Sequence, residues 1–312
     1  MRWKEELLRH AECISLFLTV TSFSNTKDVS IVGLIEAEEL IHMTMPVDLV
    51  LVRHGESEGN VASKRSKAGD QSLHTPKFLA RHSSSWRLTD LGKRQAELAG
   101  NWIREHIHGG VFDRYYVSPY LRAAETAAIL NLPNAAWRMK PHLRERDWGD
   151  LDVMAADERK RLFARNLQRR EVESLFWRPS NGESIANVCE TRVFRTCDTL
   201  HRECSKGRAI LVLHGETMWA FRITLEQLSP QRYAELDLSD DPRDHIHNCQ
   251  ILHYTREHPD THELAPNYRW MRSVCPTDLS QSRNNWEPVI RQLYTNDDLL
   301  ALVAKTPRLI AG

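Results

Sequence analysis

Cysteine is scarce in this sequence and is not arranged for metal binding or redox chemistry. Six cysteines in 312 residues are too few for a disulfide-rich scaffold, and no two of them form the C-x-x-C pair of a zinc ribbon or a thioredoxin-like motif. The spacing of Cys189, Cys197 and Cys204 places them near one face of a helix. We therefore expect these three side chains to be buried as small hydrophobic groups.

Long hydrophobic runs are missing as well. The most apolar early stretch, residues 13–20, is well short of the ~20 residues that a membrane-spanning helix needs. The basic residues before this stretch resemble the start of a signal peptide only weakly. Glutamates lie among them, and no cleavage site of small residues follows the apolar stretch. We expect a cytoplasmic protein without a membrane partner.

Neither sign of charge predominates. Lysine and arginine together number 42, and aspartate and glutamate together also number 42, so the chain has no general attraction to nucleic acid. Glycine and proline, 13 of each, are too rare for a collagen-like or low-complexity chain. We expect an ordinary globular protein with no nucleic-acid partner, and the oligomeric state stays open.

Common cofactor motifs are also absent. The sequence contains no G-x-x-x-x-G-K-[ST], no G-x-G-x-x-G and no H-E-x-x-H, so it offers no P-loop, dinucleotide or zinc-protease signature. His245, His247 and His253 could be regarded as a metal cluster, but no carboxylate or thiol completes a recognisable ligand set. We interpret them as polar residues that flank a strand, and we expect neither a metal nor another cofactor.

From residue 47 onward, apolar runs alternate with helical patterns. Strands are expected at 47–52, 111–117, 137–140, 208–213 and 250–254. Helices are expected after Thr89, from Ser118-Pro119, and over 155–175, 184–203 and 218–228. The helix at 155–175 is rich in arginine and lysine, which we interpret as a solvated face. This order predicts an α/β fold, a three-layer α/β/α sandwich with a mostly parallel central sheet.

The chain divides into two parts in this interpretation. Residues 1–44 lack the strand–helix alternation and form an N-terminal extension, and one hypothesis places the natural start at Met45. Residues 45–312 form a single domain. Its polar part, from about residue 259, is interpreted as a docked C-terminal extension of that domain.

Two of the expected strands end in a histidine followed by a glycine, at His54-Gly55 and His214-Gly215. In such sheets the site lies beyond the carboxyl ends of the strands, so we expect these histidines to belong to one site. Arg53 precedes the first of them. An arginine fork beside an imidazole suits a phosphoryl group, because the fork binds two oxygens while the ring attacks phosphorus; alone, such a pair is also compatible with a structural role.

The run at 53–60, RHGESEGN, extends this pattern. Ser57 and Asn60 can add hydrogen bonds at the start of the following helix, where anions are favoured. The run resembles the signature of the histidine phosphatase superfamily, the phosphoglycerate-mutase-like group. Further landmarks of that family follow in the expected order: LTDLG at 88–92, SPYLRAAETA at 118–127, LRERDWG at 143–149, NGES at 181–184 and LVLHG at 211–215. The resemblance covers about residues 47–254.

The resemblance implies a role for each matching position. His54 is the nucleophile that becomes phosphorylated, so its attacking nitrogen must be unprotonated. Arg53 and Arg122 bind the phosphoryl oxygens, and His214 hydrogen-bonds the phosphoryl group from across the site. The family fold is the one expected from the strand pattern.

The implied general acid is Glu145, which protonates the leaving oxygen and then activates water as a base; Asp147 is its nearby rival. The implied reaction is hydrolysis of a phosphorylated small molecule by two in-line displacements through a phosphohistidine. It needs no metal, because arginines and a second imidazole supply the positive charge.

The chain departs from the mutase branch of the family, which usually carries a tryptophan where this sequence has Gly59. We therefore expect a phosphatase. The alternatives are a phosphoglycerate-mutase-type phosphotransferase and a catalytically silent protein that binds phosphorylated ligands. The basic segment at 64–87 is either a lid that holds a second anionic group or a solvated loop.

Overall fold

The computed structural model describes residues 44–310, and these belong to one compact unit. The predictions for residues 1–43, including the apolar stretch at 13–20, lie outside the described residues. Within residues 44–310, no helix is long and apolar enough to cross a membrane.

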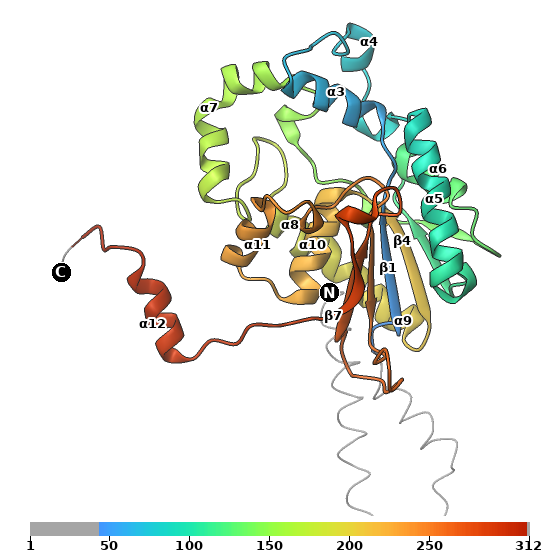
Figure 1. The fold of residues 1–312 in the computed structure, drawn as a ribbon. Helices are drawn as coiled ribbons and strands as arrows, with labels where there is room; N and C mark the ends of the chain where they lie inside the picture. The colour runs from blue at the N-terminus through green and yellow to red at the C-terminus, as the bar shows by residue number, and fades with distance from the viewer. Residues whose placement is uncertain (1–43, 311–312) are drawn as a thin grey trace, which may run out of the picture. The chain divides into compact units, whose positions relative to one another are not determined.

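A seven-stranded sheet forms the centre of this unit (Figure 1). Its strands are β1 Asp48–Arg53, β2 Arg114–Val117, β3 Trp137–Met139, β4 Arg208–Leu213, β5 Ile251–Thr255, β6 Trp270–Val274 and β7 Arg283–Pro288. The spatial order is β3-β2-β4-β1-β5-β6-β7. The short strand expected at 137–140 is β3, and it lies at the edge of the sheet.

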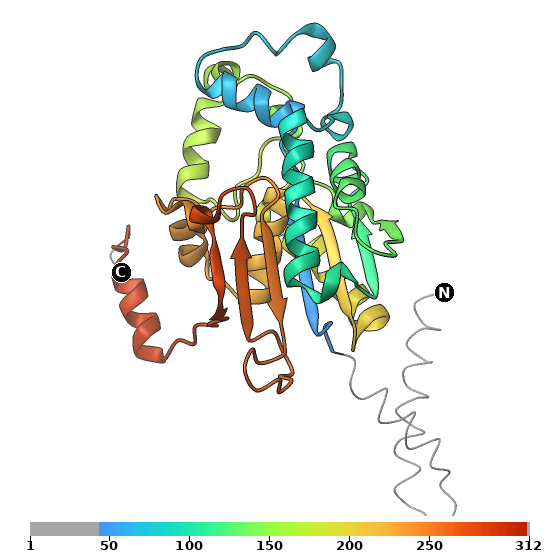
Figure 2. The ribbon, with the colours of Figure 1, turned by 45° about the vertical axis from the view of Figure 1, so that its right-hand side comes forward.

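The expectation of a mostly parallel sheet is only partly correct. Strands β3, β2, β4 and β1 pair in parallel, whereas β5, β6 and β7 are antiparallel to their neighbours. The cause is the connections. No α-helix lies between β5 and β6 or between β6 and β7, and successive strands without a crossover helix pair antiparallel (Figure 2). The polar region after residue 259, interpreted as a docked extension, supplies two of these strands.

Strand β1 is buried on both faces, which explains its uninterrupted apolar sequence. Leu49 and Leu51 belong to one hydrophobic core, and Val50 and Val52 belong to the other, as the alternation of side chains in a strand requires. Helices α9 and α10 contribute to the first core and helices α5 and α6 to the second. Figure 1 shows α10 on the opposite side of β1 and β4 from α5 and α6. The predicted three-layer arrangement is thus confirmed.

The helices follow the predicted order, with two local differences. The α-helices are α3 Glu58–Lys67, α4 Pro76–Leu79, α5 Asp90–His106, α6 Leu121–Ile129, α7 Ala156–Val172, α8 Ile185–Val188, α9 Phe194–Cys204, α10 Gly215–Glu226, α11 Pro230–Asp237 and α12 Asn296–Ala304. Thr89 caps α5 as expected. The helix expected at 184–203 is instead α8, one turn of π-helix and α9, and its three cysteines are buried as predicted.

The second difference concerns the start of α6. The sequence predicts that Ser118 caps this helix and that proline opens it, but the helix begins at Leu121 and Tyr120 occupies the N-cap position without a side-chain cap. The Ser118 hydroxyl lies 2.8 Å from Nε2 of His214 instead. Ser118 was expected to cap a helix, and it instead contacts a buried histidine.

Candidate active site

Two histidines lie together at the carboxyl ends of neighbouring parallel strands. His54 follows β1 and His214 follows β4, which pair along their length. Their ring centroids are 5.1 Å apart, and the residues are 2% and 0% exposed. Gly55 lets the chain after β1 pass close to the start of α5, because a Cβ at this position would lie 2.3 Å from the carbonyl oxygen of Gly92.

The surroundings of His54 define its tautomer. Its Nδ1 lies 2.7 Å from the carbonyl oxygen of Gly55, which can only accept, so Nδ1 carries the proton. Its Nε2 accepts a hydrogen bond of 3.0 Å from Nε of Arg122. Burial, together with the charges of Arg122 and Arg53, lowers the pKa of His54 well below its usual value. The ring is therefore neutral, and the Nε2 lone pair, which here accepts from Arg122, can attack phosphorus when a phosphoryl oxygen takes over that hydrogen bond.

Arg122 is held by a turn that is remote from it in sequence. It lies in the first turn of α6 and is 5% exposed. Its Nη1 donates to the carbonyl oxygen of Ser83 over 2.6 Å, and its guanidinium lies 5.0 Å from the ring of Tyr120 and 5.9 Å from that of Trp86. These contacts fix the plane of the guanidinium beside His54.

Arg53 is held by the loop that precedes β5. Its Nη1 donates to the carbonyl oxygen of Ile246 over 2.6 Å, while its buried Nε has no hydrogen-bond partner within the described residues. Asn248 in the same loop donates to the carbonyl oxygen of His54 over 3.1 Å. The loop thus orients both residues that end β1.

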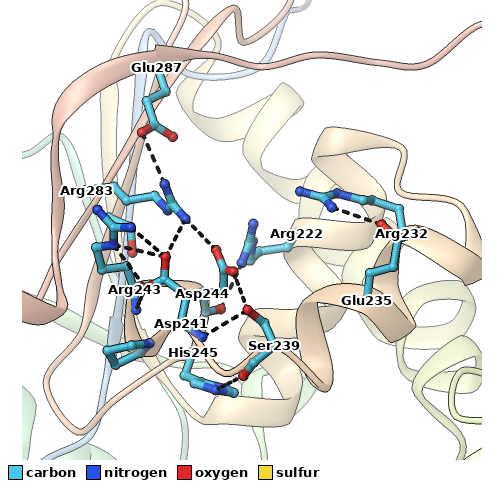
Figure 3. Close-up of polar contacts among 12 residues, drawn as sticks. Arg222, Arg232, Glu235, Ser239, Asp241, Arg243, Asp244, His245, Arg283 and Glu287 are labelled. Carbon is cyan, nitrogen blue, oxygen red and sulfur yellow. Dashed lines mark hydrogen bonds and ion pairs between the residues drawn. The ribbon is translucent and has the colours of Figure 1, made fainter.

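A network of ion pairs fixes this loop to the sheet (Figure 3). Asp244 accepts a hydrogen bond of 2.7 Å from the Ser239 hydroxyl and pairs with Arg283 of β7 at 2.8 Å. Asp241 pairs with Arg243 at 2.7 Å and with Arg283 at 3.4 Å. The antiparallel strand β7, which the sequence did not predict, therefore supports the loop that holds Arg53.

His214 is fully buried and does not line the cavity described below. Its Nδ1 is buried without a hydrogen-bond partner in the described part of the chain, and burial with the charge of Arg122 lowers its pKa well below the usual value. The ring of Tyr120 contacts it edge-on, with centroids 5.1 Å apart. His214 is thus a neutral ring that lies beside the ring of His54.

Glu145 lies in the loop after β3. Its Oε1 accepts a hydrogen bond of 2.9 Å from the backbone N–H of Arg146 and lies 3.4 Å from the Thr217 hydroxyl. Burial and the charge of Glu216 raise its pKa, against the opposing charge of Arg122. A raised pKa suits a general acid. Asp147, by contrast, is exposed and accepts a hydrogen bond from the backbone N–H of Gly149.

Ser57 and Asn60 form a capping box at the start of α3. The Ser57 hydroxyl and backbone N–H both donate to Oδ1 of Asn60, and the backbone N–H of Asn60 donates back to the hydroxyl. Asn248 donates to the same Oδ1 over 3.2 Å. Both residues line the cavity, and their side-chain oxygens shape the loop through these bonds.

These groups surround one cavity of about 400 Å³. Of the predicted site residues, Arg53, His54, Ser57, Asn60, Arg122 and Glu145 line it. Sequence reasoning missed further lining residues: Ser83, Trp86, Arg146, Trp148, Arg159, Arg170 and Glu216. The helix at 155–175 was interpreted as having a solvated face of basic residues, but two of its arginines line this cavity. No residue pattern in the sequence distinguishes those two from their exposed neighbours.

The basic segment at 64–87 reaches the cavity only through a few residues. Lys67, Ser83 and Trp86 line it, whereas Lys77 and Arg81 line a separate pocket. Arg87 pairs with Glu125 at 2.7 Å. The segment is thus partly a wall of the site and partly exposed surface.

The three histidines considered as a metal cluster have separate partners. His245 and His247 each contact a backbone carbonyl oxygen, and His253 pairs with Asp48 at 2.9 Å. Among the residues described by the structure, no group of three or more His, Cys, Asp or Glu side chains is arranged to hold a metal ion.

The profile of the histidine phosphatase superfamily (branch 1) matches residues 49–265, a range that contains both histidines and both arginines of the site. The chain belongs to this superfamily. It is 31% identical over 202 residues to a 2,3-bisphosphoglycerate-dependent phosphoglycerate mutase of Cytophaga hutchinsonii, a match that covers 62% of this chain and 84% of the relative. It is 27% identical over 213 residues to a phosphoglycerate mutase-like protein of Arabidopsis thaliana, covering 62% of each.

Solved structures of other proteins share the fold of this chain. A mycobacterial glucosyl-3-phosphoglycerate phosphatase aligns with a TM-score of 0.51 at 20% identity, covering 67% of this chain and 92% of its own. An alpha-ribazole phosphatase of Shigella flexneri aligns with a TM-score of 0.52 at 18% identity, covering 71% and 96%. At these identities the likeness concerns the fold alone, and the phosphoglycerate-mutase-like architecture expected from the motifs is confirmed.

Proposed function

We propose that this superfamily member is a phosphomonoesterase that hydrolyses a phosphorylated small molecule through a phosphohistidine on His54. The observation that carries the proposal is the state of that ring. Nδ1 is committed to the carbonyl oxygen of Gly55, and the Nε2 lone pair faces Arg122 on the wall of the cavity. A neutral imidazole held beside an arginine is a nucleophile oriented toward a phosphoryl group.

In the first step, Nε2 of His54 attacks phosphorus and the bond from phosphorus to the leaving oxygen breaks. Glu145, whose raised pKa favours the protonated form, gives its proton to the leaving oxygen. Its Oε2 forms no hydrogen bond within the described residues, so this oxygen is free to act as the donor.

In the second step, the Glu145 carboxylate takes a proton from water and the resulting hydroxide attacks phosphorus. The bond between phosphorus and Nε2 breaks, which regenerates neutral His54 and protonated Glu145. Arg53 and Arg122 stabilise the negative charge on the phosphoryl oxygens in both transition states. The buried Nε of Arg53, which lacks a partner, is one of the donors available for this purpose.

A mutase is the second candidate, and the similarity to the Cytophaga hutchinsonii mutase favours it. The two reactions share the phosphohistidine and differ in what accepts the phosphoryl group, water or a second hydroxyl group of a phosphorylated small molecule. Gly59, which replaces the tryptophan usual in mutases, supports the hydrolase.

The test is phosphate release from a broad set of phosphomonoesters in the presence of a chelator. We expect the wild type to release phosphate and to gain the mass of one phosphoryl group when quenched in alkali, and we expect His54→Ala to do neither. His262→Ala, at an exposed histidine, is the matched control and should retain full activity. Equal turnover by His54→Ala would refute the proposal; transfer that depends on a doubly phosphorylated primer, without release to water, would favour the mutase.

A further inference from the structure

The loop that carries Glu145 is held by a buried arginine that does not itself line the cavity. Arg192 is 2% exposed, and it is not among the residues around the catalytic cavity. Its Nη1 donates to the carbonyl oxygen of Arg144 over 2.6 Å, and its Nη2 pairs with Oε2 of Glu183 at 2.8 Å. Arg144 immediately precedes Glu145, so this guanidinium holds the peptide group that leads into the proposed acid.

A second donor reaches the same carbonyl oxygen from another element. The buried Thr217 hydroxyl of α10 donates to the carbonyl oxygen of Arg144 over 2.8 Å and lies 3.4 Å from Oε1 of Glu145. Two donors on one carbonyl oxygen fix the direction of a planar peptide group. The Cα of Glu145 lies in that plane, so the two donors together determine where its carboxyl group can point.

Glu183 extends this support to the other side of Glu145. Its Oε1 accepts from Nη2 of Arg144 over 2.9 Å, and its Oε2 accepts from the backbone N–H of Asp147 over 2.9 Å as well as from Arg192. The backbone N–H of Glu183 donates in turn to the carbonyl oxygen of Asp147 over 2.9 Å. The loop is therefore fixed both before and after the proposed acid.

Arg192 reaches the loop from a turn that interrupts a helix. The sequence predicts one helix over 184–203, but Cys189–Val193 is a turn of π-helix between α8 and α9. Such turns are rare and occur frequently at functional sites. Here the turn holds Arg192 among buried side chains, whereas Arg195, less than one helical turn further on, is exposed.

The burial of Arg192 is costly for a group that serves stability alone. A buried ion pair is often no more stabilising than well-packed apolar side chains of similar volume. Burial lowers the pKa of Arg192, and the charge of Glu183 opposes this shift. Within residues 44–310, every hydrogen bond of this guanidinium ends on Glu183 or on the backbone carbonyl oxygens of Arg144 and Glu145. The contacts that offset the cost thus all lie at the loop of the proposed acid.

We propose that Arg192, assisted by Thr217, is a positioning residue for the general acid: it orients the peptide group before Glu145 so that the carboxyl group faces the leaving oxygen. Arg192 acts through Glu145 and does not touch the substrate. The inference rests on the proposed function, because it concerns proton transfer in the same reaction. It predicts a defect that appears only where the leaving group needs a proton.

Two substrates that differ in their leaving group test this role. Propyl phosphate releases an alcohol, whose oxygen needs a proton, whereas 4-nitrophenyl phosphate releases a stable phenolate without an acid. Arg192→Lys retains the charge but lacks the fork that reaches both acceptors. We expect this variant to lower kcat/KM for propyl phosphate by about tenfold or more, through kcat rather than KM. For 4-nitrophenyl phosphate, kcat/KM should stay within about twofold of the wild-type value.

Thr217→Val removes the other donor to the same carbonyl oxygen and no buried charge, so it tests the role even if Arg192→Lys folds poorly. It should show the same dependence on the leaving group. The matched controls are Arg195→Lys, at the exposed arginine of α9, and Thr224→Val, at a threonine that bonds within α10; both should retain both activities. In a Glu145→Gln background, Arg192→Lys should cause no further loss with propyl phosphate, because the group that it orients is gone.

Equal losses with the two substrates, no loss with propyl phosphate, or a further loss in the Glu145→Gln background would overturn the inference. Hydrogen exchange of the backbone at 143–149 keeps it separable from the proposed function. Faster exchange there in Arg192→Lys, with no change in Arg195→Lys, supports the positioning of the loop even if no phosphate is released, and unchanged exchange overturns it. Failure of 4-nitrophenyl phosphate to phosphorylate His54 in wild type would instead contradict the proposed function.

Discussion

In the proposed mechanism Glu145 holds and releases a proton in each turnover, and its immediate contacts suit that role. One oxygen, Oε1, is fixed by the backbone N–H of Arg146 and lies near Thr217, so the other can face the leaving oxygen. Burial and the neighbouring Glu216 favour the protonated form, while Arg122 moderates the shift. A pKa raised in this way suits a group that donates a proton in one step and accepts one in the next.

The pH dependence of kcat tests this role. As the pH rises through the raised pKa of Glu145, the acid form disappears, so kcat for an alkyl phosphate should fall on the alkaline side. Glu145→Gln should lower kcat by about 100-fold or more and remove this alkaline decline. Because the pKa of His54 is lowered, the acidic decline in kcat/KM should lie below the usual imidazole range.

The rival carboxylate provides the control for that profile. Asp147→Asn changes an exposed group that does not line the cavity, and it should retain both the rate and the alkaline decline. If instead the decline persists in Glu145→Gln and vanishes in Asp147→Asn, the acid is Asp147 and the assignment of Glu145 is wrong.

At the scale of elements, the turn at Ser83–Ser85 and the following Trp86 position Arg122, which binds the phosphoryl group in the proposed mechanism. Ser83 holds Arg122 through its carbonyl oxygen. Trp86 stacks on Phe78 with centroids 5.1 Å apart, and its ring occupies the space where a side chain at residue 59 would lie, since a Cβ on Gly59 would be 2.1 Å from it. The ring of Trp86 thus takes the space that a side chain at residue 59 of this chain would need.

Gly59→Ala should displace the indole and with it the turn that orients Arg122. We expect kcat/KM to fall about tenfold, a loss of about 1.4 kcal/mol in transition-state stabilisation, with the circular dichroism spectrum unchanged. In a Trp86→Ala background the space is already empty, so the same substitution should have little further effect. Steady-state kinetics of the double-mutant cycle measure this coupling, and additive losses would show that the ring and the glycine act independently.

How far the sequence predicts these elements depends on how completely each is buried. Strands β1 and β4 are central and covered on both faces, so their apolar runs identify them and the histidines at their ends. Strand β7 is partly exposed along its whole length, and its sequence, RNNWEP, carries no apolar alternation. The sequence pattern therefore could not predict it, although it supports the loop beside Arg53.

The sequence likewise predicts only some of the contacts in the candidate site. Side chains with characteristic spacing, such as His54 and Arg122, are recognisable from the sequence. The carbonyl oxygens of Ser83 and Ile246 that hold the two arginines are not, because every residue carries one and only the tertiary fold selects it. Nor can periodicity tell which polar side chain of α7 faces the cavity.

At the scale of the whole molecule, the end of β1 remote from His54 is held by a buried charged group. Asp48 is 3% exposed; it pairs with His253 of β5 at 2.9 Å and with Arg208 of β4 at 3.1 Å. Nδ1 of His253 accepts from Nε of Arg272 on β6 over 3.3 Å, so the ring is neutral and its Nε2 donates to Asp48. One carboxylate thereby joins four strands of the sheet.

Removing that carboxylate should destabilise the fold without touching the site. We expect Asp48→Asn to lower the free energy of unfolding by about 3 kcal/mol, since breaking a buried pair leaves its partners without a full acceptor. His108→Ala removes a partner of the same carboxylate whose side chain is 41% exposed and should cost less than about 1 kcal/mol. Urea unfolding measures the free energy of unfolding of both variants. If the two variants lose equal amounts, the buried contacts of Asp48 do not contribute more than its exposed contact with His108.

The pH dependence of stability follows from the same cluster. Burial alone would raise the pKa of Asp48, but the hydrogen bond from His253 holds it below its usual value, so its contribution is lost as the pH falls through the acidic range. Burial lowers the pKa of His253 in the folded protein. As the pH falls, the unfolded chain therefore binds a proton at this histidine before the folded chain does, and the free energy of unfolding again decreases. We expect Asp48→Asn to unfold with a shallower acid dependence than wild type; an unchanged slope in urea titrations at successive pH values would mean that other groups carry the acid sensitivity of the sheet.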